Sequence, residues 1–370
     1  MGYFVAPLLT YGNSKERNMQ PKVLCYRISM QVLTGVSLKL YSTMRLGGTA
    51  AYLKEVSTKQ ELVEALEWAS AQSLPVIMIG QGSNIVWQDE GFQGLILVNK
   101  FAGFEQINND DVSTTYTIGA GEDWDAIVGR LVSLGLSGVE GLSLIPGTVG
   151  ATPVQNVGAY GAEISRVLLH VEAYDSQKKE FVIINNAECG FGYRTSRFKT
   201  IDKGRFFITS ITLKLHKTLP KPPFYSTLKD YLDKYEIHEF TPQIIRDAVI
   251  AIRSDKMPDW HKIANNGSFF ANPLVPKTTY EKLKLKFPEL VGWQHGTDYK
   301  LSAGWLVEKT GLKGHHDAET GMATSNKTAL VLINEHARST ADLLKFKEMI
   351  VGKVEDMFGI TLEQEPELLP

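Results

Sequence analysis

The strongest structural constraint in this 370-residue sequence is a short apolar run that leads directly into a glycine-containing loop. Residues 75–79 (PVIMI) have the length and composition of a buried strand, and residues 80–84 (GQGSN) follow without a break. A capping-box pattern at 58–61 (TKQE) predicts a helix over 58–72, and residues 94–99 predict the next strand. Glycines at the end of a buried strand let backbone N–H groups approach a ligand closely.

Two further glycine segments, 119–121 (GAG) and 147–150 (GTVG), share this property. Each is compatible with an ordinary turn as well as with a cradle for a diphosphate group. No G-x-G-x-x-G follows a predicted strand and no G-x-x-x-x-G-K-[ST] occurs, so the Rossmann and P-loop signatures are both missing. A cofactor bound by these loops is therefore held in a different type of fold.

The length of the chain exceeds what one hydrophobic core usually organises, so we expect two or three packed units. Hydrophobic residues make up 43% of the sequence and the formal net charge is −2, without the bias of a nucleic-acid-binding or membrane protein. No apolar run approaches the roughly 20 residues that span a bilayer. Cys25 and Cys189 offer neither a disulfide framework nor metal-ligand spacing, which favours a reducing compartment and no metal site.

A proline cluster at 220–223 is the best linker candidate in the chain. Prolines favour extended backbone and cannot donate to a sheet or helix interior, so we place a domain boundary within 216–224. The first 35 or so residues are a candidate disordered tail, and Met19 and Met30 leave a downstream start open. Capping and periodicity signals predict further elements at 205–215 (strand), 241–253, 302–310 and 340–358 (helices) and 360–365 (strand).

Two segments combine polar side chains with glycines or aromatics. Amides and glycines flank a tyrosine at 155–161 (QNVGAYG), which is typical either of a capped turn or of a wall against a flat heteroaromatic ring. Three cations follow a tyrosine at 193–199 (YRTSRFK), which favours either a solvated basic loop or recognition of an anion by a guanidinium. Arg253 and Lys256 form a second cationic pair, which is equally compatible with capping of a helix C-terminus.

One serine, Ser268, lies among glycine, amides and two phenylalanines at 265–273 (NNGSFFANP). Because no G-x-S-x-G motif is present, a hydrolase serine is disfavoured. An Asx-rich turn packed on two core phenylalanines accounts for the segment, and the sharper interpretation is a serine that donates a proton to a strong carbanionic base. Composition alone does not select the functional glutamate of the C-terminal segment 363–367 (EQEPE).

Taken in order, these segments resemble the UDP-N-acetylenolpyruvoylglucosamine reductase family, the FAD enzymes (MurB) that make UDP-N-acetylmuramate for peptidoglycan. The resemblance covers roughly residues 38–368 and corresponds to the longer type of the family, which carries a tyrosine loop. Its motifs are Thr43-Met44-Arg45-Leu46-Gly47-Gly48, Gly82-Ser83-Asn84, Ile145-Pro146-Gly147-Thr148-Val149-Gly150, Gln155-Asn156-Val157-Gly158-Ala159-Tyr160-Gly161, Tyr193-Arg194-x-Ser196-x-Phe198-Lys199, Gly267-Ser268-Phe269-Phe270-x-Asn272-Pro273 and Leu362-Glu363-x-Glu365.

The resemblance implies an α+β fold in which residues 1–35 are an N-terminal extension. A two-subdomain, non-Rossmann FAD-binding module would span 36–217, and a C-terminal α+β domain that binds the UDP-sugar would span 218–370. The implied reaction is the NADPH-dependent reduction, through FAD, of the enolpyruvyl ether of UDP-N-acetylglucosamine-enolpyruvate to UDP-N-acetylmuramate. The resemblance further implies a cytoplasmic enzyme of cell wall biogenesis, cell shape and cell division, which we expect to be a monomer without nucleic-acid or membrane partners.

Residue by residue, the resemblance assigns Arg194 to the substrate carboxylate, Ser268 to proton donation and Glu365 to the opposing carboxyl group. A last strand of the C-terminal domain would return this glutamate to the site. Substrate contacts are implied for Tyr193, Tyr225, Lys256 and Asn272. Cofactor contacts are implied for Gly47, Gly80, Gly82, Ser83, Asn84, Gly119, Gly121, Pro146, Gly147, Gly150, Gln155, Asn156, Gly158 and Tyr160.

The C-terminal motif departs from the common family ending Leu-Glu-Pro-Glu-Val. Here residues 362–367 are LEQEPE, so a shift of two residues would nominate Glu367 on the same strand face, whereas register counted from Phe358 favours Glu365. Two other functions are weighed against the reductase. A flavin oxidase or dehydrogenase acting on an alcohol or hydroxy acid would not need Ser268, and a catalytically silent nucleotide-sugar-binding protein would be colourless.

Overall fold

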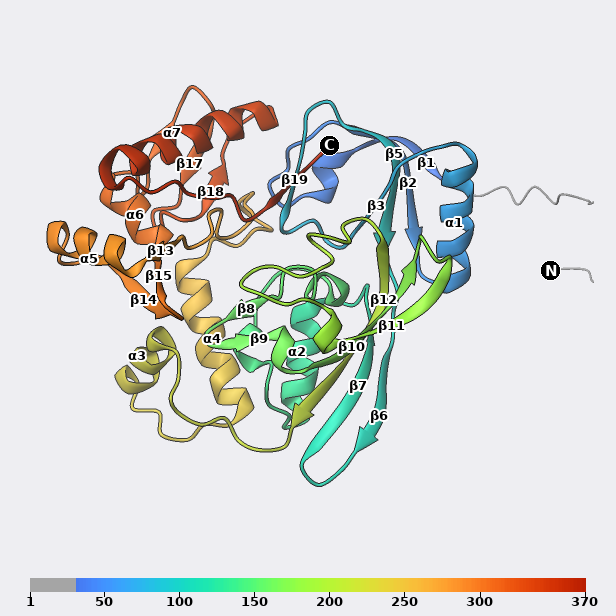
Figure 1. The fold of residues 1–370 in the computed structure, drawn as a ribbon, viewed down its shortest axis with the longest axis horizontal. Helices are drawn as coiled ribbons and strands as arrows, with labels where there is room; N and C mark the ends of the chain where they lie inside the picture. The colour runs from blue at the N-terminus through green and yellow to red at the C-terminus, as the bar shows by residue number, and fades with distance from the viewer. Residues whose placement is uncertain (1–30) are drawn as a thin grey trace, which may run out of the picture. The chain divides into compact units, whose positions relative to one another are not determined.

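A four-stranded mixed sheet begins the part of the chain that the computed structural model describes, residues 31–370 (Figure 1). Cys25, Met19, Met30 and most of the expected extension lie outside the described residues. The strand order is β1-β2-β5-β3, with β2, β5 and β3 parallel and β1 antiparallel to β2. The bounds are Leu33–Ser37 (β1), Thr49–Val56 (β2), Val76–Ile79 (β3) and Phe92–Asn99 (β5).

Helix α1 (Lys59–Ala71) connects β2 to β3 and lies along this sheet in Figure 1. The predicted capping box is confirmed, because Thr58 accepts a bond from the N–H of Glu61 and the Glu61 carboxylate accepts one from the N–H of Thr58. The buried positions Leu62, Ala65 and Ala69 follow helical periodicity, which explains why this segment packs as a helix. Strand β3 ends at Ile79, directly before Gly80, as the sequence predicts.

A second, five-stranded sheet is antiparallel throughout, with the order β11-β10-β12-β7-β6. Its strands are Phe104–Asn109 (β6), Ser113–Gly119 (β7), Leu168–Asp175 (β10), Glu180–Asn185 (β11) and Phe206–His216 (β12). Helix α2 (Trp124–Ser133) follows β7, and the Asp123 side chain caps its N-terminus. The short hairpin β8 (Gly158–Ala159) and β9 (Ala162–Glu163) precedes β10. Turns of 3-10 helix lie at Leu38–Tyr41, Glu140–Leu142, Val149–Ala151, Ile164–Arg166 and Asn186–Glu188.

The remaining chain combines helices with small sheets. Two helices, α3 (Ser226–Lys234) and α4 (Pro242–Lys256), follow the proline cluster, which lies in the loop after β12. The predicted N-cap is confirmed, since the Thr241 hydroxyl accepts the N–H of Ile244. The other elements are β13 (Leu274–Pro276), α5 (Lys277–Lys286), β14 (Gly292–His295), β15 (Asp298–Leu301), α6 (Ala303–Lys309), β16 (His316–Asp317), β17 (Met322–Thr324), β18 (Leu332–Asn334) and α7 (Thr340–Phe358).

The longest helix, α7, organises the core of this C-terminal part. Its buried face includes Phe346, Ile350 and Val354, which belong to one cluster with Phe269 and Phe270. Met44, Leu46 and Val86 from the N-terminal part join the same cluster, so the hydrophobic core crosses from one part to the other. Residues 32–370 accordingly form one compact unit. The expected α+β class is confirmed.

The C-terminal strand lies later than predicted. We predict a strand over 360–365, but β19 spans Glu367–Leu369 and pairs in parallel with β4 (Ile85–Trp87). Pro366 lacks the N–H that would continue a ladder, which separates the two stretches. The preceding residues still run extended beside 268–271, because Glu365 N–H donates to Phe269 O and Ala271 N–H donates to Glu363 O, both at 2.9 Å.

Candidate active site

A cavity of about 630 Å³ lies where both sheets and the C-terminal part meet. Its lining comes from the loop after β3, the segments 145–152 and 154–159, the turn at 266–268, the end of α4 and the C-terminal residues 365–370. The volume lies within the range of cofactor and small-molecule sites. Of the residues expected to contact cofactor or to take part in catalysis, twelve line this cavity: Gly80, Gly82, Ser83, Asn84, Pro146, Gly147, Gly150, Gln155, Gly158, Arg194, Ser268 and Glu365.

Residues 80–84 and 146–150 form what we call the glycine-rich end of the cavity. A Cβ at Gly80 would lie 2.2 Å from Oγ1 of Thr148, so a side chain is sterically excluded there, and the φ of +137° at Gly147 is strained for any residue with a Cβ. The loops are tied together, since Ser83 Oγ donates to Pro146 O at 2.8 Å and Gly147 N–H donates to Gln81 Oε1 at 3.0 Å. This end therefore presents mainly backbone, the surface that a diphosphate requires.

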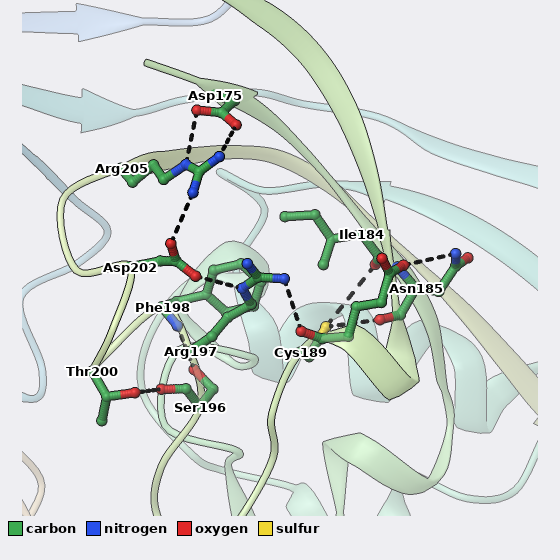
Figure 2. A network of polar contacts seen from close by, with 11 residues as sticks. Asp175, Ile184, Asn185, Cys189, Ser196, Arg197, Phe198, Thr200, Asp202 and Arg205 are labelled. Atoms are coloured by element: carbon green, nitrogen blue, oxygen red, sulfur yellow. Dashed lines mark hydrogen bonds and ion pairs between the residues drawn. The ribbon is translucent and has the colours of Figure 1, made fainter. Parts of the chain in front are cut away.

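The loop between β11 and β12 carries Arg194 into the cavity, and a polar network anchors that loop (Figure 2). Arg205 binds Asp175 through two bonds of 3.0 and 2.6 Å, and it also binds Asp202 at 3.1 Å. Arg197 Nε donates to the other oxygen of Asp202 at 2.7 Å. The bidentate arginine lowers the pKa of Asp175 to about 2. The network fixes both ends of the segment 197–205 against the second sheet.

Arg194 lies in a tight turn closed by mutual backbone bonds of Gly192 and Thr195, and its φ is +54°. A left-handed conformation is uncommon for a residue with a side chain and is often found at functional sites. Its Nη2 donates to Gly158 O at 2.5 Å, and its Nε lies 3.4 Å from Oε1 of Glu365. The turn therefore holds one guanidinium between the 155–161 segment and the C-terminal glutamate.

Glu365 is a mostly buried carboxyl group, with 16% of its side chain exposed, and its pKa is raised above the ordinary value. Desolvation raises the pKa of Glu365, while the nearby charges of Arg194 and Lys199 lower it. The net direction is upward because burial dominates. Ser268 lies on the adjacent segment, whose next residue, Phe269, accepts the backbone N–H of Glu365. The structure thus brings Arg194, Ser268 and Glu365 to the wall of one cavity, although 171 positions separate residue 194 from residue 365.

Glu367 also lines the cavity but has a different partner. Its Oε1 lies 2.5 Å from Nζ of Lys203, and its backbone belongs to β19. The two candidate glutamates are therefore distinguished by their cations: Arg194 for Glu365 and Lys203 for Glu367.

Other expected site residues lie outside the cavity lining. A Cβ at Gly47 would lie 2.4 Å from Cβ of Trp87, and a Cβ at Gly119 or Gly121 would collide with the backbone of 100–102. These three glycines permit close packing of the chain. A sequence alone does not tell whether a glycine is needed for such packing or for contact with a ligand. Asn156 is buried and braces the Arg194 turn through a bond to Gly192 O at 3.1 Å.

The expected substrate residues Tyr193, Tyr225, Lys256 and Asn272 do not line the cavity, and neither does the expected cofactor residue Tyr160. Tyr160 and Tyr225 meet edge to face with ring centroids 6.1 Å apart. Tyr193 lies against Asn272, whose Oδ1 also accepts the N–H of Ala303 at 2.9 Å. Lys256 is exposed at the end of α4.

The cavity is also lined by residues that are not among the expected site residues. Arg253, one turn before Lys256, lines it, and Asn266 is buried there with its Oδ1 lacking a hydrogen-bond partner among the described residues. Lys199 and Lys203 line it as well. The two consecutive asparagines before Gly267 could have indicated Asn266 as a site residue. For Arg253, the sequence fits a cation that caps a helix C-terminus equally well.

These residues fit an FAD molecule. The glycine-rich end has the shape that a diphosphate needs, and the cavity is large enough for an extended ligand with a flat ring. The unpartnered Nε of Arg253 and Oδ1 of Asn266 are a buried donor and a buried acceptor without partners among the described residues, as expected where a polar ligand supplies them.

Comparison with known proteins agrees with this assignment. A sequence model of an FAD binding domain matches residues 50–180, and a model described as the C-terminal domain of UDP-N-acetylenolpyruvoylglucosamine reductase matches residues 258–369. The structure adds two observations on the described part of the chain. Within residues 31–370, no group of His, Cys, Asp or Glu is arranged to hold a metal ion. No helix in this described part is long and apolar enough to cross a membrane.

Full-length relatives extend the match over nearly the whole chain. UDP-N-acetylenolpyruvoylglucosamine reductases of Ralstonia nicotianae and Alcanivorax borkumensis are 40% and 38% identical; the alignments cover 88% and 91% of this chain and 96% and 95% of theirs. The crystal structure of the Thermus caldophilus reductase (MurB) aligns with a TM-score of 0.63 at 26% identity, covering 92% of this chain and 100% of that one.

An α+β fold with a glycine-rich cavity and a matching FAD binding domain defines a flavin-dependent oxidoreductase. The chain belongs to the UDP-N-acetylenolpyruvoylglucosamine reductase family. Its role is therefore in the synthesis of peptidoglycan precursors, with FAD as cofactor.

Proposed function

We propose that this protein reduces the enolpyruvyl ether of UDP-N-acetylglucosamine-enolpyruvate to UDP-N-acetylmuramate, with NADPH as the electron donor. The observation that carries the proposal is the convergence of Arg194, Ser268 and Glu365 on one cavity, with Arg194 Nε 3.4 Å from the Glu365 carboxyl group. A cation, a proton donor and a protonated carboxyl group are the groups that an enolate intermediate needs. The names of the relatives support the same substrate class.

FAD held by the glycine-rich end of the cavity, residues 80–84 and 146–150, would supply the hydride chemistry that links NADPH to the terminal carbon of the enolpyruvyl group. Negative charge then develops on the substrate carboxylate as an enolate. Arg194 and the protonated Glu365 stabilise this charge by donating hydrogen bonds, and each well-placed donor is worth about 3 kcal/mol. The positive charge of Arg194 is fixed in position by its bond to Gly158 O, so little reorganisation is needed.

Ser268 completes the reduction by giving its hydroxyl proton to the carbon next to the carboxylate. Only a strongly basic enolate draws a proton from an alcohol, so this step follows hydride addition and the serine regains a proton from solvent. Overall the substrate gains one hydride and one proton, and NADPH becomes NADP⁺. Because both half-reactions use the same cavity in turn, we expect ping-pong kinetics.

We also propose a division of labour along the chain. Residues 36–217 bind FAD, and residues 218–370 bind the UDP-sugar through Tyr225, Lys256 and Asn272, with Tyr193 beside them. The FAD domain match at 50–180 and the C-terminal domain match at 258–369 support this division. The first strand that the structure describes, β1, starts at Leu33, three residues before this boundary. The monomeric state and the cytoplasmic location stay predictions.

The test uses the purified full-length protein under anaerobic conditions. We expect visible flavin absorbance that bleaches with NADPH and returns when the enolpyruvyl substrate is added, with UDP-N-acetylmuramate as product. A flavin that is reoxidised by oxygen but not by this substrate would support an oxidase instead. A colourless protein that binds the UDP-sugar would support a nucleotide-sugar-binding function.

A further inference from the structure

Arg253 is a cavity-lining cation to which the proposed reaction assigns no role. It lies at the end of α4, and its Nε is buried without a hydrogen-bond partner among the described residues. Burial lowers the pKa of Arg253 from its ordinary value, as expected for a cation removed from water. Buried guanidinium groups are normally paired, because an unpaired one loses its hydration without compensation.

The protein itself supplies Arg253 with only partial compensation. The nearest influences are the hydroxyl of Tyr160 and the carboxylate of Asp125. That carboxylate is already engaged, because Arg246 donates to both of its oxygens at 2.7 and 3.1 Å and Leu144 N–H donates at 2.6 Å. Arg253 therefore retains donor capacity for a ligand in the cavity.

Two contacts place Arg253 at the catalytic part of the cavity rather than at the glycine-rich end. Tyr160, which faces it, belongs to the 155–161 segment that also holds Arg194 through Gly158 O. On the other side, Met257, which directly follows α4 and also lines the cavity, has its Cε 3.6 Å from the position of a Cβ on Gly267, the residue before Ser268. The end of α4 thus lies between the 155–161 segment and the serine turn.

Negative charge appears in two places during the proposed reaction. One is the substrate carboxylate, for which Arg194 and Glu365 are arranged. The other is the flavin ring, which on reduction carries an anionic charge spread over the N1 and C2 carbonyl edge of its pyrimidine ring. A cation near this edge stabilises the reduced form. We propose that Arg253 binds the pyrimidine edge of the flavin and stabilises its anionic reduced form, acting as a redox-tuning residue.

This inference rests on the flavin chemistry of the proposed function but is tested without NADPH or the enolpyruvyl substrate. The full-length FAD-loaded protein is reduced with dithionite beside a reference dye, and the equilibrium ratio of reduced to oxidised flavin is measured. Arg253→Gln lowers this ratio roughly tenfold relative to wild type, as expected from the loss of one charge-assisted hydrogen bond. Arg253→Lys, which keeps the charge, gives an intermediate value.

Lys262→Gln is the matched control, because it removes one positive charge from a side chain that is 82% exposed and does not line the cavity. Its ratio should stay within twofold of wild type. An Arg253→Gln protein that holds FAD and also stays within twofold would overturn the proposal. So would a defect confined to the dissociation constant of the UDP-sugar, which would instead assign Arg253 to the substrate diphosphate.

If Arg253→Gln does not retain FAD, the wild-type protein decides the question. The visible spectrum distinguishes anionic from neutral reduced flavin, and it is followed as the pH is lowered. We expect the anionic spectrum to persist in the protein at pH values where free reduced FAD is already protonated. Protonation at the same pH as free reduced FAD would contradict a cation at the pyrimidine edge.

Discussion

The two ends of the cavity differ in how their polar groups are satisfied. At the glycine-rich end the side chains bond to one another, as Asn84 does with Gln155 at 2.5 Å and Gln81 with Asp123 at 2.7 Å. At the other end, which we call the charged end and define as Arg194, Arg253, Ser268 and Glu365, two of the four groups are incompletely compensated for their burial. Arg253 Nε has no partner among the described residues, and burial raises the pKa of Glu365.

This difference separates binding from chemistry. A surface whose side chains are already satisfied contributes shape and backbone donors, so changes there should alter cofactor affinity. Polar groups that lack hydrogen-bond partners before the ligand binds are already positioned for charge that develops in the reaction. Substitutions of these groups should therefore alter the rate of the chemical step. Substitutions at the two ends are therefore expected to give distinguishable kinetic defects.

The largest effect is expected for Ser268→Ala. Removing the hydroxyl leaves no proton donor for the enolate, and reoxidation of the reduced flavin by the enolpyruvyl substrate should fall about 10³-fold. Reduction of the flavin by NADPH should stay within threefold of wild type, which serves as the internal control. Stopped-flow absorbance measures both half-reactions. Retention of the second rate within tenfold would show that Ser268 is not the donor.

Glu365→Ala is expected to have the next largest effect. It removes one donor to the developing enolate, and about 10²-fold of the second half-reaction should be lost. Glu365→Gln keeps an N–H donor and should retain more activity than the alanine variant, since the protonated carboxyl group is the active form. Glu367→Ala, which removes the partner of Lys203, is the matched control and should stay within threefold. The reverse order of the two alanine variants would assign the role to Glu367.

The same carboxyl group predicts a pH dependence. Burial raises the pKa of Glu365, so the protonated, donating form is full at low pH and is lost as pH rises through this raised pKa. The second half-reaction of the wild-type protein should therefore slow with rising pH. Glu365→Gln has no proton to lose, and its profile should lack this decline. A decline that survives in Glu365→Gln would belong to another group.

The sequence predicted the glycine-rich end more completely than the charged end. A glycine after a buried strand indicates that the backbone there needs an unusual conformation or a close approach. Three glycines nominated in this way, Gly80, Gly82 and Gly147, line the cavity. The same argument also nominates Gly119 and Gly121, which do not line the cavity and pack against neighbouring backbone. A glycine that admits a neighbouring backbone looks the same in a sequence as one that admits a ligand.

The charged end depends on tertiary contacts between distant segments. Arg194 and Ser268 occur in unusual local motifs, but only the fold brings residue 365 beside residue 194. Arg253 could not be selected, because helix periodicity places it three residues before Lys256 without telling which of the two turns toward the cavity. The late position of β19 likewise follows from its pairing with β4, a partner more than 280 positions away.

The Asp175–Arg205 pair behind the Arg194 loop is expected to stabilise the fold from outside the cavity. Asp175→Asn breaks a bidentate pair with Arg205, in which the aspartate side chain is 1% exposed, and should lower the free energy of unfolding by about 2 kcal/mol. Urea unfolding measures this loss. Glu180→Gln, which touches an exposed pair with Lys178 at 3.8 Å, is the control and should cost less than about 0.5 kcal/mol.

This stabilisation should also depend on pH. Arg205 lowers the pKa of Asp175 to about 2, from 3.8, so the contribution is complete above pH 4 and is lost as pH falls through about 2. The difference in unfolding free energy between wild type and Asp175→Asn should shrink over this interval. A difference that stays constant down to pH 2.5 would mean that the variant loses packing rather than an ion pair.

The smallest effect is expected at the glycine-rich end, with Gly147→Ala. A φ of +137° is strained for alanine, and the added Cβ would lie 3.3 Å from Oγ of Ser83 in the cavity wall. We expect the dissociation constant of FAD to rise about tenfold, with rates at saturating FAD near those of wild type. Gly135→Ala is the control, since its φ is +75° and nothing lies within 4 Å of the added Cβ. It should lower stability without weakening FAD binding, and an equal loss of FAD affinity in both variants would remove the distinction between the two ends.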